Sequence, residues 1–334
     1  MSRFTIKVGS RGPHKEHAPS PLYLGVDGGG TRTTAWVCDE RGHVLGRGMA
    51  GAANPIKVGL AAAEREILAA GNRALSEAGG RNLEAVCLGL AGADRTEISG
   101  PLLEWLCKRL PARFQLVTTD AAIALEAARG RLPAIVLIAG TGSIACGRDT
   151  QGNVLRAGGW GSAFGDAGSG YDIGRQAVRS AMRAIDGLGD RTRLVKRLPR
   201  ALGLREIRKV VGLQLSAADV AALAPAVIEA ARRGDAVARK ILDDAGAELA
   251  DLALALIRRL GLNDQPVSVV YTGGLLQASA AMRRIVRNHL QAQAPLARLS
   301  RLRRQSVEGA LALALSRGVG ASKKITARGR SGEA

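Results

Sequence analysis

With 334 residues, the chain exceeds one ordinary domain of about 100–200 residues and suits two. Its apolar fraction of 46% and its 43 glycines are typical of a globular α/β protein, and no run approaches the roughly 20 apolar residues of a membrane helix. The formal net charge of +19 attracts anions, but the basic stretches lack interleaved aromatic residues and any helix-turn-helix or zinc pattern, so they indicate solvated faces rather than nucleic-acid binding.

The first half of the chain predicts three consecutive strands followed by alternating helices and strands. Residues 1–20 precede it and mix charged residues with Pro, Gly and Ser without periodicity, so we expect a disordered basic tail. Short apolar runs between turn residues predict the strands, and stretches rich in Ala, Leu and Glu predict the helices. The strands are expected at 22–26, 33–38, 44–48, 85–90 and 114–117, and the helices at about 57–77, at about 97–109 and from about residue 121.

The second half begins in the same way, with three strands, and then continues through more helices. Strands are expected at 134–139, 143–147, 154–157, 267–271 and 296–302, and helices at about 174–184, 217–232, 235–259, from about 278, and at about 306–316. Both halves therefore fit the order βββαβαβα, and each opens with a strand that ends in a glycine turn. The sequence predicts an α/β fold made of two copies of one architecture.

Three glycine-rich turns directly follow predicted buried strands. They are Asp27-Gly28-Gly29-Gly30-Thr31, Gly140-Thr141-Gly142-Ser143 and Thr272-Gly273-Gly274. One strand followed by Gly-Gly is common in α/β proteins and carries little information alone. A phosphate chain, however, needs backbone N–H groups at close range, and only glycine lets the main chain approach without a Cβ in the way. The three turns together predict a nucleotide-binding site.

The acid before the first turn suits a magnesium ion. Asp27 is expected to hold hydrated Mg²⁺ between the β- and γ-phosphates of ATP, mostly through water, because this ion dehydrates reluctantly. The chain has no G-x-x-x-x-G-K-[ST] sequence and no G-x-G-x-x-G that opens a helix, which disfavours the P-loop and dinucleotide folds. We therefore predict ATP and Mg²⁺ as the cofactors.

Asp120 follows the predicted strand at 114–117 and begins a helix near the junction of the two halves. Its local pattern leaves two interpretations open. An Asp at such a place often serves as a helix N-cap. A carboxylate at the cleft between two domains can instead act as a general base toward an attacking hydroxyl, which is a poor nucleophile until its proton is accepted.

The loop 158–170 is the densest group of candidate binding residues. It holds Trp160 and Phe164, two of the nine aromatic residues (three each of Phe, Trp and Tyr), and one acid, Asp166, among small residues. Flat aromatic faces and a carboxylate suit the C–H faces and hydroxyls of a sugar, although the two rings could also fill a gap in the core. Asn54 precedes a proline, where Asn is common in turns as well.

The motifs resemble those of a known family. LGVDGGGTRTTAWV resembles the first phosphate motif of the N-acetylglucosamine kinase branch of the BadF/BadG/BcrA/BcrD ATPases, within the actin/hexokinase-like superfamily. IAGTGSIACG and VVYTGGLL resemble its second phosphate motif and its adenosine motif, in the same order and spacing, and the resemblance spans about residues 22–318. It implies two RNase H-like domains around a nucleotide cleft, at 21–118 and 119–305. The helix at 306–316 is then expected to return to the first domain, with a hinge at 130–133 and a basic tail at 317–334.

The resemblance also implies roles for individual residues. TTDA matches the segment with the catalytic aspartate, so Asp120 is expected to be the general base. The expected sugar contacts are Asn54, Asp120, Gly159, Trp160, Gly161 and Asp166. The implied activity is an ATP-dependent kinase, acting on the 6-hydroxyl of N-acetylglucosamine or glucosamine, in a homodimer. The family loop usually reads GDEGS, whereas Ala167 stands in place of its glutamate here, which leaves the identity of the sugar open.

Two other functions are compatible with the same superfamily. One is an ATPase that activates a dehydratase through an iron–sulfur cluster bridged between subunits, but the four cysteines (Cys38, Cys87, Cys107 and Cys146) are too dispersed for an obvious ligand set. The other is a non-catalytic sugar-sensing regulator, for which no DNA-binding module is found. Scattered cysteines in apolar stretches, together with no apolar leader, indicate reduced thiols in the cytoplasm.

Overall fold

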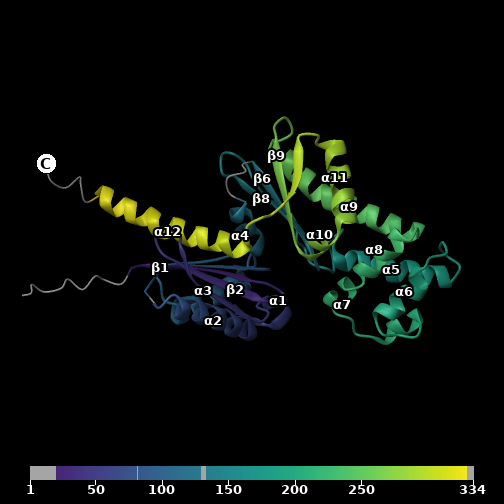
Figure 1. Cartoon of the computed structure of the whole chain (residues 1–334), viewed down its shortest axis with the longest axis horizontal. Helices are drawn as coiled ribbons and strands as arrows, with labels where there is room; N and C mark the ends of the chain where they lie inside the picture. Colours follow the sequence, from purple (N-terminus) through teal and green to yellow (C-terminus); the bar gives the residue numbers. More distant parts are fainter. Residues whose placement is uncertain (1–19, 81, 129–132, 329–334) are drawn as a thin grey trace, which may run out of the picture.

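The computed structural model describes residues 20–80, 82–128 and 133–328 (Figure 1). The predicted disordered tail lies outside the described residues except for Ser20, and so does the predicted hinge except for Pro133. The predicted basic tail, 317–334, is described as far as Arg328, and up to that residue it forms the end of the last helix. Within the described part, no helix combines the length and the apolar character that a membrane span needs.

The first half contains five strands and four helices close to the predicted positions. They are β1 (Leu22–Gly28), β2 (Thr33–Cys38), β3 (Val44–Ala50), α1 (Pro55–Val58), α2 (Leu60–Glu77), β4 (Leu83–Leu90), α3 (Thr96–Arg109), β5 (Phe114–Thr118) and α4 (Asp120–Ala127). The single helix predicted at 57–77 is wrong in its first turn. Gly59 has a φ of 79°, a left-handed conformation that ends α1 before α2 begins.

The second half also follows the predicted order but contains more helices. Its elements are β6 (Ala134–Ala139), β7 (Ser143–Arg148), β8 (Val154–Gly158), α5 (Gly170–Ile185), α6 (Leu194–Ala201), the 3₁₀ helix η1 (Ile207–Gly212), α7 (Ala217–Ala221), α8 (Ala224–Arg232), α9 (Ala236–Arg259), β9 (Val267–Thr272), α10 (Gly274–Ala278), α11 (Ala280–Gln293), β10 (Ala297–Arg301) and α12 (Ser306–Arg328). The sequence prediction missed α6 and η1. In α6 the buried Leu194 and Leu198 are separated by Lys196 and Arg197, so the short apolar pattern is weak.

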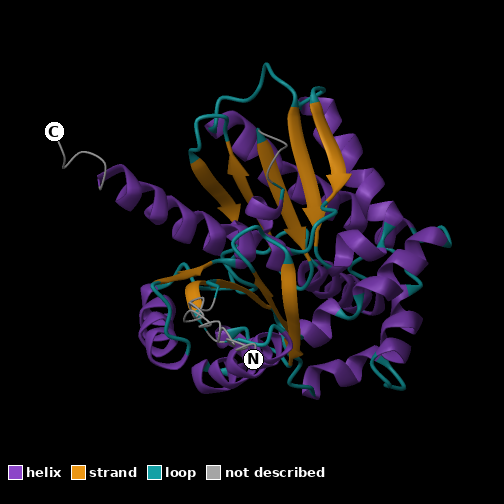
Figure 2. Cartoon of the chain, turned by 60° about the vertical axis from the view of Figure 1, so that its left-hand side comes forward, coloured by secondary structure: helices purple, strands orange, loops and turns teal. Residues whose placement is uncertain are grey.

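The strands form two five-stranded sheets of the same topology, as the repeated pattern predicts (Figure 2). The order is β3-β2-β1-β4-β5 in one sheet and β8-β7-β6-β9-β10 in the other. In each sheet the first three strands are antiparallel neighbours, and the last two are parallel to the first strand. Short turns can join only antiparallel strands, whereas parallel strands need a crossover that is usually helical, so the element order dictates this arrangement.

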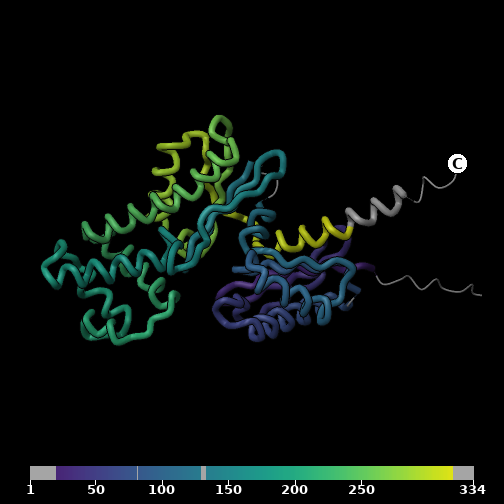
Figure 3. Tube along the Cα trace, turned by 180° about the vertical axis from the view of Figure 1, so that it is seen from behind, coloured from purple at the N-terminus to yellow at the C-terminus, as the bar shows by residue number. Residues whose placement is uncertain are grey.

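Side chains on alternate residues of β1 point to opposite faces of the first sheet, and helices cover both faces. Leu24 and Val26 pack with residues of α2 and α3, whereas Tyr23 packs with residues of α12 on the opposite face. The last helix, α12, packs against β1, so the end of the described chain lies beside its start (Figure 3). A Cβ on Gly25 would lie 2.4 Å from the Leu311 backbone nitrogen, so the two backbones meet directly.

Helix α4 lies between the two halves and contacts both sheets. Ile123 packs into the cluster with Tyr23 and α12, whereas Ala124 and Leu125 pack against β6 and β7 of the second sheet. The predicted boundary between residues 118 and 119 falls at the start of this helix. As a result, the residue that begins α4, Asp120, lies at the junction of the halves.

Candidate active site

The second and third glycine turns lie together at one edge of the second sheet. They follow β6 and β9, which are parallel neighbours and therefore end at the same edge. A Cβ on Gly140 would lie 3.6 Å from the Gly274 backbone nitrogen. Gly273 has a φ of 92°, and a Cβ there would lie 2.4 Å from the carbonyl oxygen of Ala139. Only glycine fits this contact, which brings the two turns together.

Helix α5 fixes the second turn from its other side. The backbone N–H of Gly170 donates to the Gly140 carbonyl at 2.8 Å, and that of Tyr171 donates to the Thr141 carbonyl at 3.2 Å. Ser169 caps the helix by accepting a hydrogen bond from the backbone of Asp172 at 3.2 Å. These contacts fix the position of the turn relative to α5.

Asp166 lies against the same turn. Its Oδ1 accepts from the Ser143 backbone N–H at 3.2 Å, and a Cβ on Gly142 would lie 2.7 Å from its Oδ2. Among the described residues, Asp166 is the one non-glycine residue with a positive φ, at 55°, a strained conformation that often marks a functional site. Burial raises the pKa of Asp166, while hydrogen bonds from the backbones of Ser143 and Gly161 and the charge of Lys57 oppose the rise.

The aromatic residues of this loop do not fill a gap in the core. Trp160 is 67% exposed and Phe164 is 96% exposed. The Trp160 ring instead lies under the guanidinium of Arg156, with 4.6 Å between the Arg156 Cζ and the ring centroid. The two rings are therefore available to a ligand.

The first turn is tied to the segment that carries Asn54. The Gly29 backbone N–H donates to the Arg32 carbonyl at 2.9 Å, and the Ala53 N–H donates to the Gly29 carbonyl at 3.0 Å. Asn54 caps α1, because its Oδ1 accepts from the Ile56 backbone N–H at 3.0 Å. Its amide nitrogen has no hydrogen-bond partner among the described residues, which leaves two N–H groups for a ligand.

Asp120 is not the N-cap of α4, since that position belongs to Thr119. The Thr119 hydroxyl accepts from the Ala122 N–H at 3.1 Å, while Asp120 is the first helical residue. Its Oδ1 accepts from the Ala121 N–H at 2.9 Å. Burial raises the pKa of Asp120, and the nearby charge of Asp94 adds to the rise.

Asp27 faces the same region from the first sheet. Burial, and then repulsion from Asp120, raise its pKa from 3.8 to about 6, while Arg32 opposes the rise. Two carboxylates crowded in this way would be stabilised by a divalent cation. In the described ranges, no group of three or more His, Cys, Asp or Glu side chains is arranged to hold a metal ion.

Sequence patterns do not reveal the ion pair that crosses the junction. Arg156 on β8 lies 3.4 Å from Asp94, measured between the guanidinium Nη2 and the carboxylate Oδ2. Asp94 comes shortly after β4, and an acid after a buried strand is the one signal that could have indicated it. The pair connects the two halves beside Asp120.

The cysteines are poorly placed to bind an iron–sulfur cluster between subunits. Cys38, Cys87 and Cys146 are buried, and burial raises their thiol pKa values to about 12, 12 and 11. Cluster ligands are thiolates, which such surroundings disfavour. Cys107 is exposed on α3.

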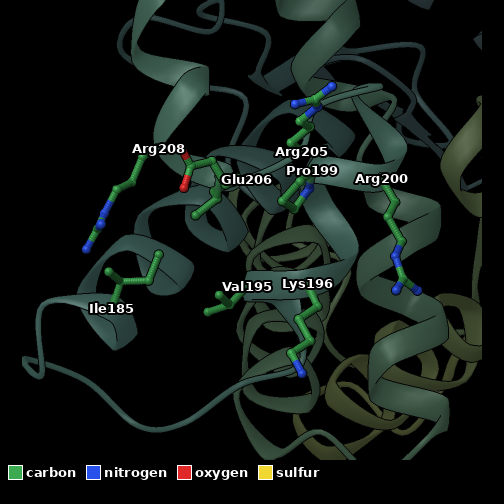
Figure 4. Close-up of a pocket in the computed structure, with 9 residues that line it drawn as sticks. Ile185, Val195, Lys196, Pro199, Arg200, Arg205, Glu206 and Arg208 are labelled. Carbon is green, nitrogen blue, oxygen red and sulfur yellow. The ribbon is translucent and has the colours of Figure 1, made fainter.

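A separate cavity of about 430 Å³ lies between α5, α6 and η1, within the basic stretch 191–209 (Figure 4). Its lining includes Lys196, Arg200, Arg205 and Arg208, together with one acid, Glu206. Figure 4 shows the three guanidinium groups pointing in different directions, so their charge does not converge on one point. None of the predicted site residues lines this cavity.

Comparisons with known proteins agree with the sequence motifs. A family model described as the BadF/BadG/BcrA/BcrD ATPase family matches residues 24–314. The N-acetyl-D-glucosamine kinase of Dictyostelium discoideum is 30% identical over 312 residues, and the N-acetylmuramic acid/N-acetylglucosamine kinase of Clostridium acetobutylicum is 31% identical over 304 residues. Each alignment covers 88% of this chain and 98% of the relative. A crystal structure of a candidate N-acetylglucosamine kinase from Chromobacterium violaceum has a TM-score of 0.73 at 29% identity, covering 89% of this chain and 99% of that one.

Proposed function

The chain belongs to the BadF/BadG/BcrA/BcrD ATPase family, and we propose that it is an ATP-dependent amino-sugar kinase acting on the 6-hydroxyl of N-acetylglucosamine or glucosamine. One observation carries the proposal. The partly buried carboxylate of Asp120 lies at the junction of two sheets of equal topology and is close enough to Asp27 to raise its pKa. The kinase activity of relatives that align along most of the chain supports the same reaction.

The proposed role of Asp120 is to accept the proton of the sugar hydroxyl. As that proton moves, the sugar oxygen attacks the γ-phosphorus in line, the bond from this phosphorus to the bridging oxygen breaks, and ADP leaves. Backbone N–H groups of the turns at Gly28–Gly30, Gly140–Gly142 and Gly273–Gly274 would hold the phosphates and the adenosine side of the nucleotide. Mg²⁺, when bound near Asp27 through water, would neutralise charge on the phosphate oxygens.

The sugar site in this proposal lies around Asp120 and is completed by both halves of the chain. Asn54 offers its unpaired amide N–H groups, and the exposed Trp160 between Gly159 and Gly161 offers an apolar face. Asp166 offers a carboxylate to the sugar hydroxyls, held in place by Ser143. Ala167 contributes only its backbone carbonyl, which accepts a hydrogen bond from the Ser143 hydroxyl at 2.7 Å.

A coupled assay of ADP release tests the proposal. Wild-type protein and Asp120→Asn are assayed with ATP and Mg²⁺ against glucosamine, N-acetylglucosamine, N-acetylmuramic acid and glucose, and phosphorus NMR locates the phosphate on the product. We expect turnover with at least one amino sugar and a phosphate on the 6-oxygen. Absence of turnover with every amino sugar, or comparable rates for Asp120→Asn, would contradict the proposal.

A further inference from the structure

Lys57 extends across the first glycine turn from the short helix α1. A Cβ on Gly30 would lie 3.0 Å from the Lys57 Nζ and 3.6 Å from its Cδ and Cε. The lysine side chain thus occupies the space that the absent side chain of Gly30 leaves over the turn. Lys57 is itself exposed, so its ammonium group can reach a ligand bound there.

The charge of the same ammonium group also acts on the other half of the chain. The positive charge of Lys57 lowers the pKa of Asp166, whose carboxylate is in contact with Gly142. Lys57 therefore lies against the first turn and acts through its charge on the carboxylate beside the second turn. Lys57 forms no ion pair within 4.0 Å among the described residues, so no close carboxylate neutralises its charge.

We infer that Lys57 is a further catalytic residue, which binds the γ-phosphate of ATP and neutralises negative charge on the phosphoryl group during transfer. The inference rests on the proposed function. The transferred group carries its charge on three oxygens, and positioned cations are a main source of catalysis in phosphoryl transfer. Arg32 is a second cation near this turn, and its charge lowers the pKa of Asp27, whereas Lys57 lies directly over Gly30.

The test compares a nucleotide that has a γ-phosphate with one that lacks it. Calorimetry measures the affinity of the full chain, with Mg²⁺, for β,γ-imido-ATP and for ADP. The proteins are wild type, Lys57→Met, Lys57→Arg and, as a matched control, Lys108→Met, which changes an exposed lysine at the end of α3.

We expect Lys57→Met to bind the imido nucleotide about tenfold more weakly and ADP within about twofold of wild type. Its kcat should fall about tenfold to a hundredfold, with the sugar KM within about twofold. Lys57→Arg keeps the charge and should recover most of the preference for the triphosphate, while Lys108→Met should behave as wild type.

Equal weakening of both nucleotides by Lys57→Met would overturn the inference, because it would indicate a structural role of α1. An unchanged affinity for the imido nucleotide together with an unchanged kcat would overturn it as well. In either case wild-type protein would still phosphorylate the sugar, so the proposed function would stand. Wild-type protein that binds neither nucleotide would overturn both.

Discussion

Asp120 illustrates how a position in a fold can set the acidity of one side chain. It begins a helix that lies between two sheets, so its side chain is partly shielded from water, and Asp94 is close enough to disfavour its ionised form. Both effects raise the pKa of Asp120, with burial the larger. A base of raised pKa accepts a proton more readily but is deprotonated only at higher pH.

This balance predicts the acidic side of the pH–rate profile. In the proposed mechanism Asp120 accepts a proton and therefore acts only when deprotonated, so kcat/KM should fall as the pH decreases through its raised pKa. In Asp94→Asn the neighbouring charge is lost and Arg156 is released from its partner, and both changes favour ionised Asp120. We expect the acidic limb to move to lower pH, as measured from kcat/KM of the free enzyme. Asp264→Asn, which changes an exposed acid, is the control, and an upward shift in Asp94→Asn would contradict the assignment.

Asp27 predicts an effect on stability in the protein without nucleotide or magnesium. Its pKa is raised from the ordinary value of 3.8 to about 6, so the folded chain favours the protonated carboxyl group. Relative to a group with an unshifted pKa, the stabilisation from this group is fully present below pH 3.8 and is lost as the pH rises through about 6. Asp27→Asn removes the buried charge. Its free energy of unfolding should exceed that of wild type by about 3 kcal/mol at pH 7.5 and by less than about 1 kcal/mol at pH 4.

Denaturant titrations at the two pH values measure this difference. Asp264→Asn again serves as the control and should match wild type within about 0.5 kcal/mol at both. An Asp27→Asn protein that is less stable than wild type at pH 7.5 would show that the ionised carboxylate is stabilised rather than strained in the folded chain.

At the scale of elements, close contact between α4 and α12 sets the position of Asp120. A Cβ on Gly309 of α12 would lie 1.8 Å from the carbonyl oxygen of Ile123 in α4. No side chain can be accommodated unless the two helices separate. The closing helix therefore supports the position of Asp120 through the backbone of α4.

Gly309→Ala tests this contact. In a helix, alanine is more favourable than glycine by about 1 kcal/mol. The clash of the new Cβ with the backbone of α4 should cost more than this gain, so we expect the free energy of unfolding to fall by about 2 kcal/mol. Gly100→Ala is the matched control, since Gly100 lies inside α3 and a Cβ there would meet nothing within 4 Å. It should leave stability unchanged or raise it by up to about 1 kcal/mol. Equal effects of the two substitutions in chemical denaturation would contradict the close contact.

At the scale of the whole molecule, two equal sheets meet at a junction crossed by the Asp94–Arg156 pair. The side chains are 38% and 36% exposed, so water and salt screen the attraction. Pairs of this kind contribute about 0–1 kcal/mol. The halves are therefore held mainly by the packing of α4 and α12 rather than by this ion pair.

A double-mutant cycle of Asp94→Asn and Arg156→Gln measures the pair directly. We expect a coupling free energy of about 0.5 kcal/mol in unfolding experiments at low salt, and a smaller value in 0.5 M salt (roughly a 4 Å screening length). Coupling above about 2 kcal/mol that salt does not reduce would mean that the pair is buried and that the halves are closed in solution.

Local patterns in the chain are enough to specify most of the elements, the repeated sheet topology and the three glycine turns. Strands such as β2 and β6 are apolar runs with clear ends, and their order leaves few ways to pair them. Local patterns do not predict α6, where basic residues separate the two buried leucines. They also do not predict the break at Gly59, where one positive φ divides the expected helix in two. In both places a few contacts or one dihedral angle outweigh composition.

The tertiary structure decides which residues meet. Asp94, Arg156 and Lys57 have ordinary neighbours in sequence, and they become candidates only because folding brings two distant halves to one junction. The same holds for Asp120, since its local sequence allows it to be the N-cap of the helix, whereas the structure gives that position to Thr119. Charges interact through space over several ångströms, whereas sequence patterns report on neighbours along the chain, and so the electrostatics of the site follow from packing alone.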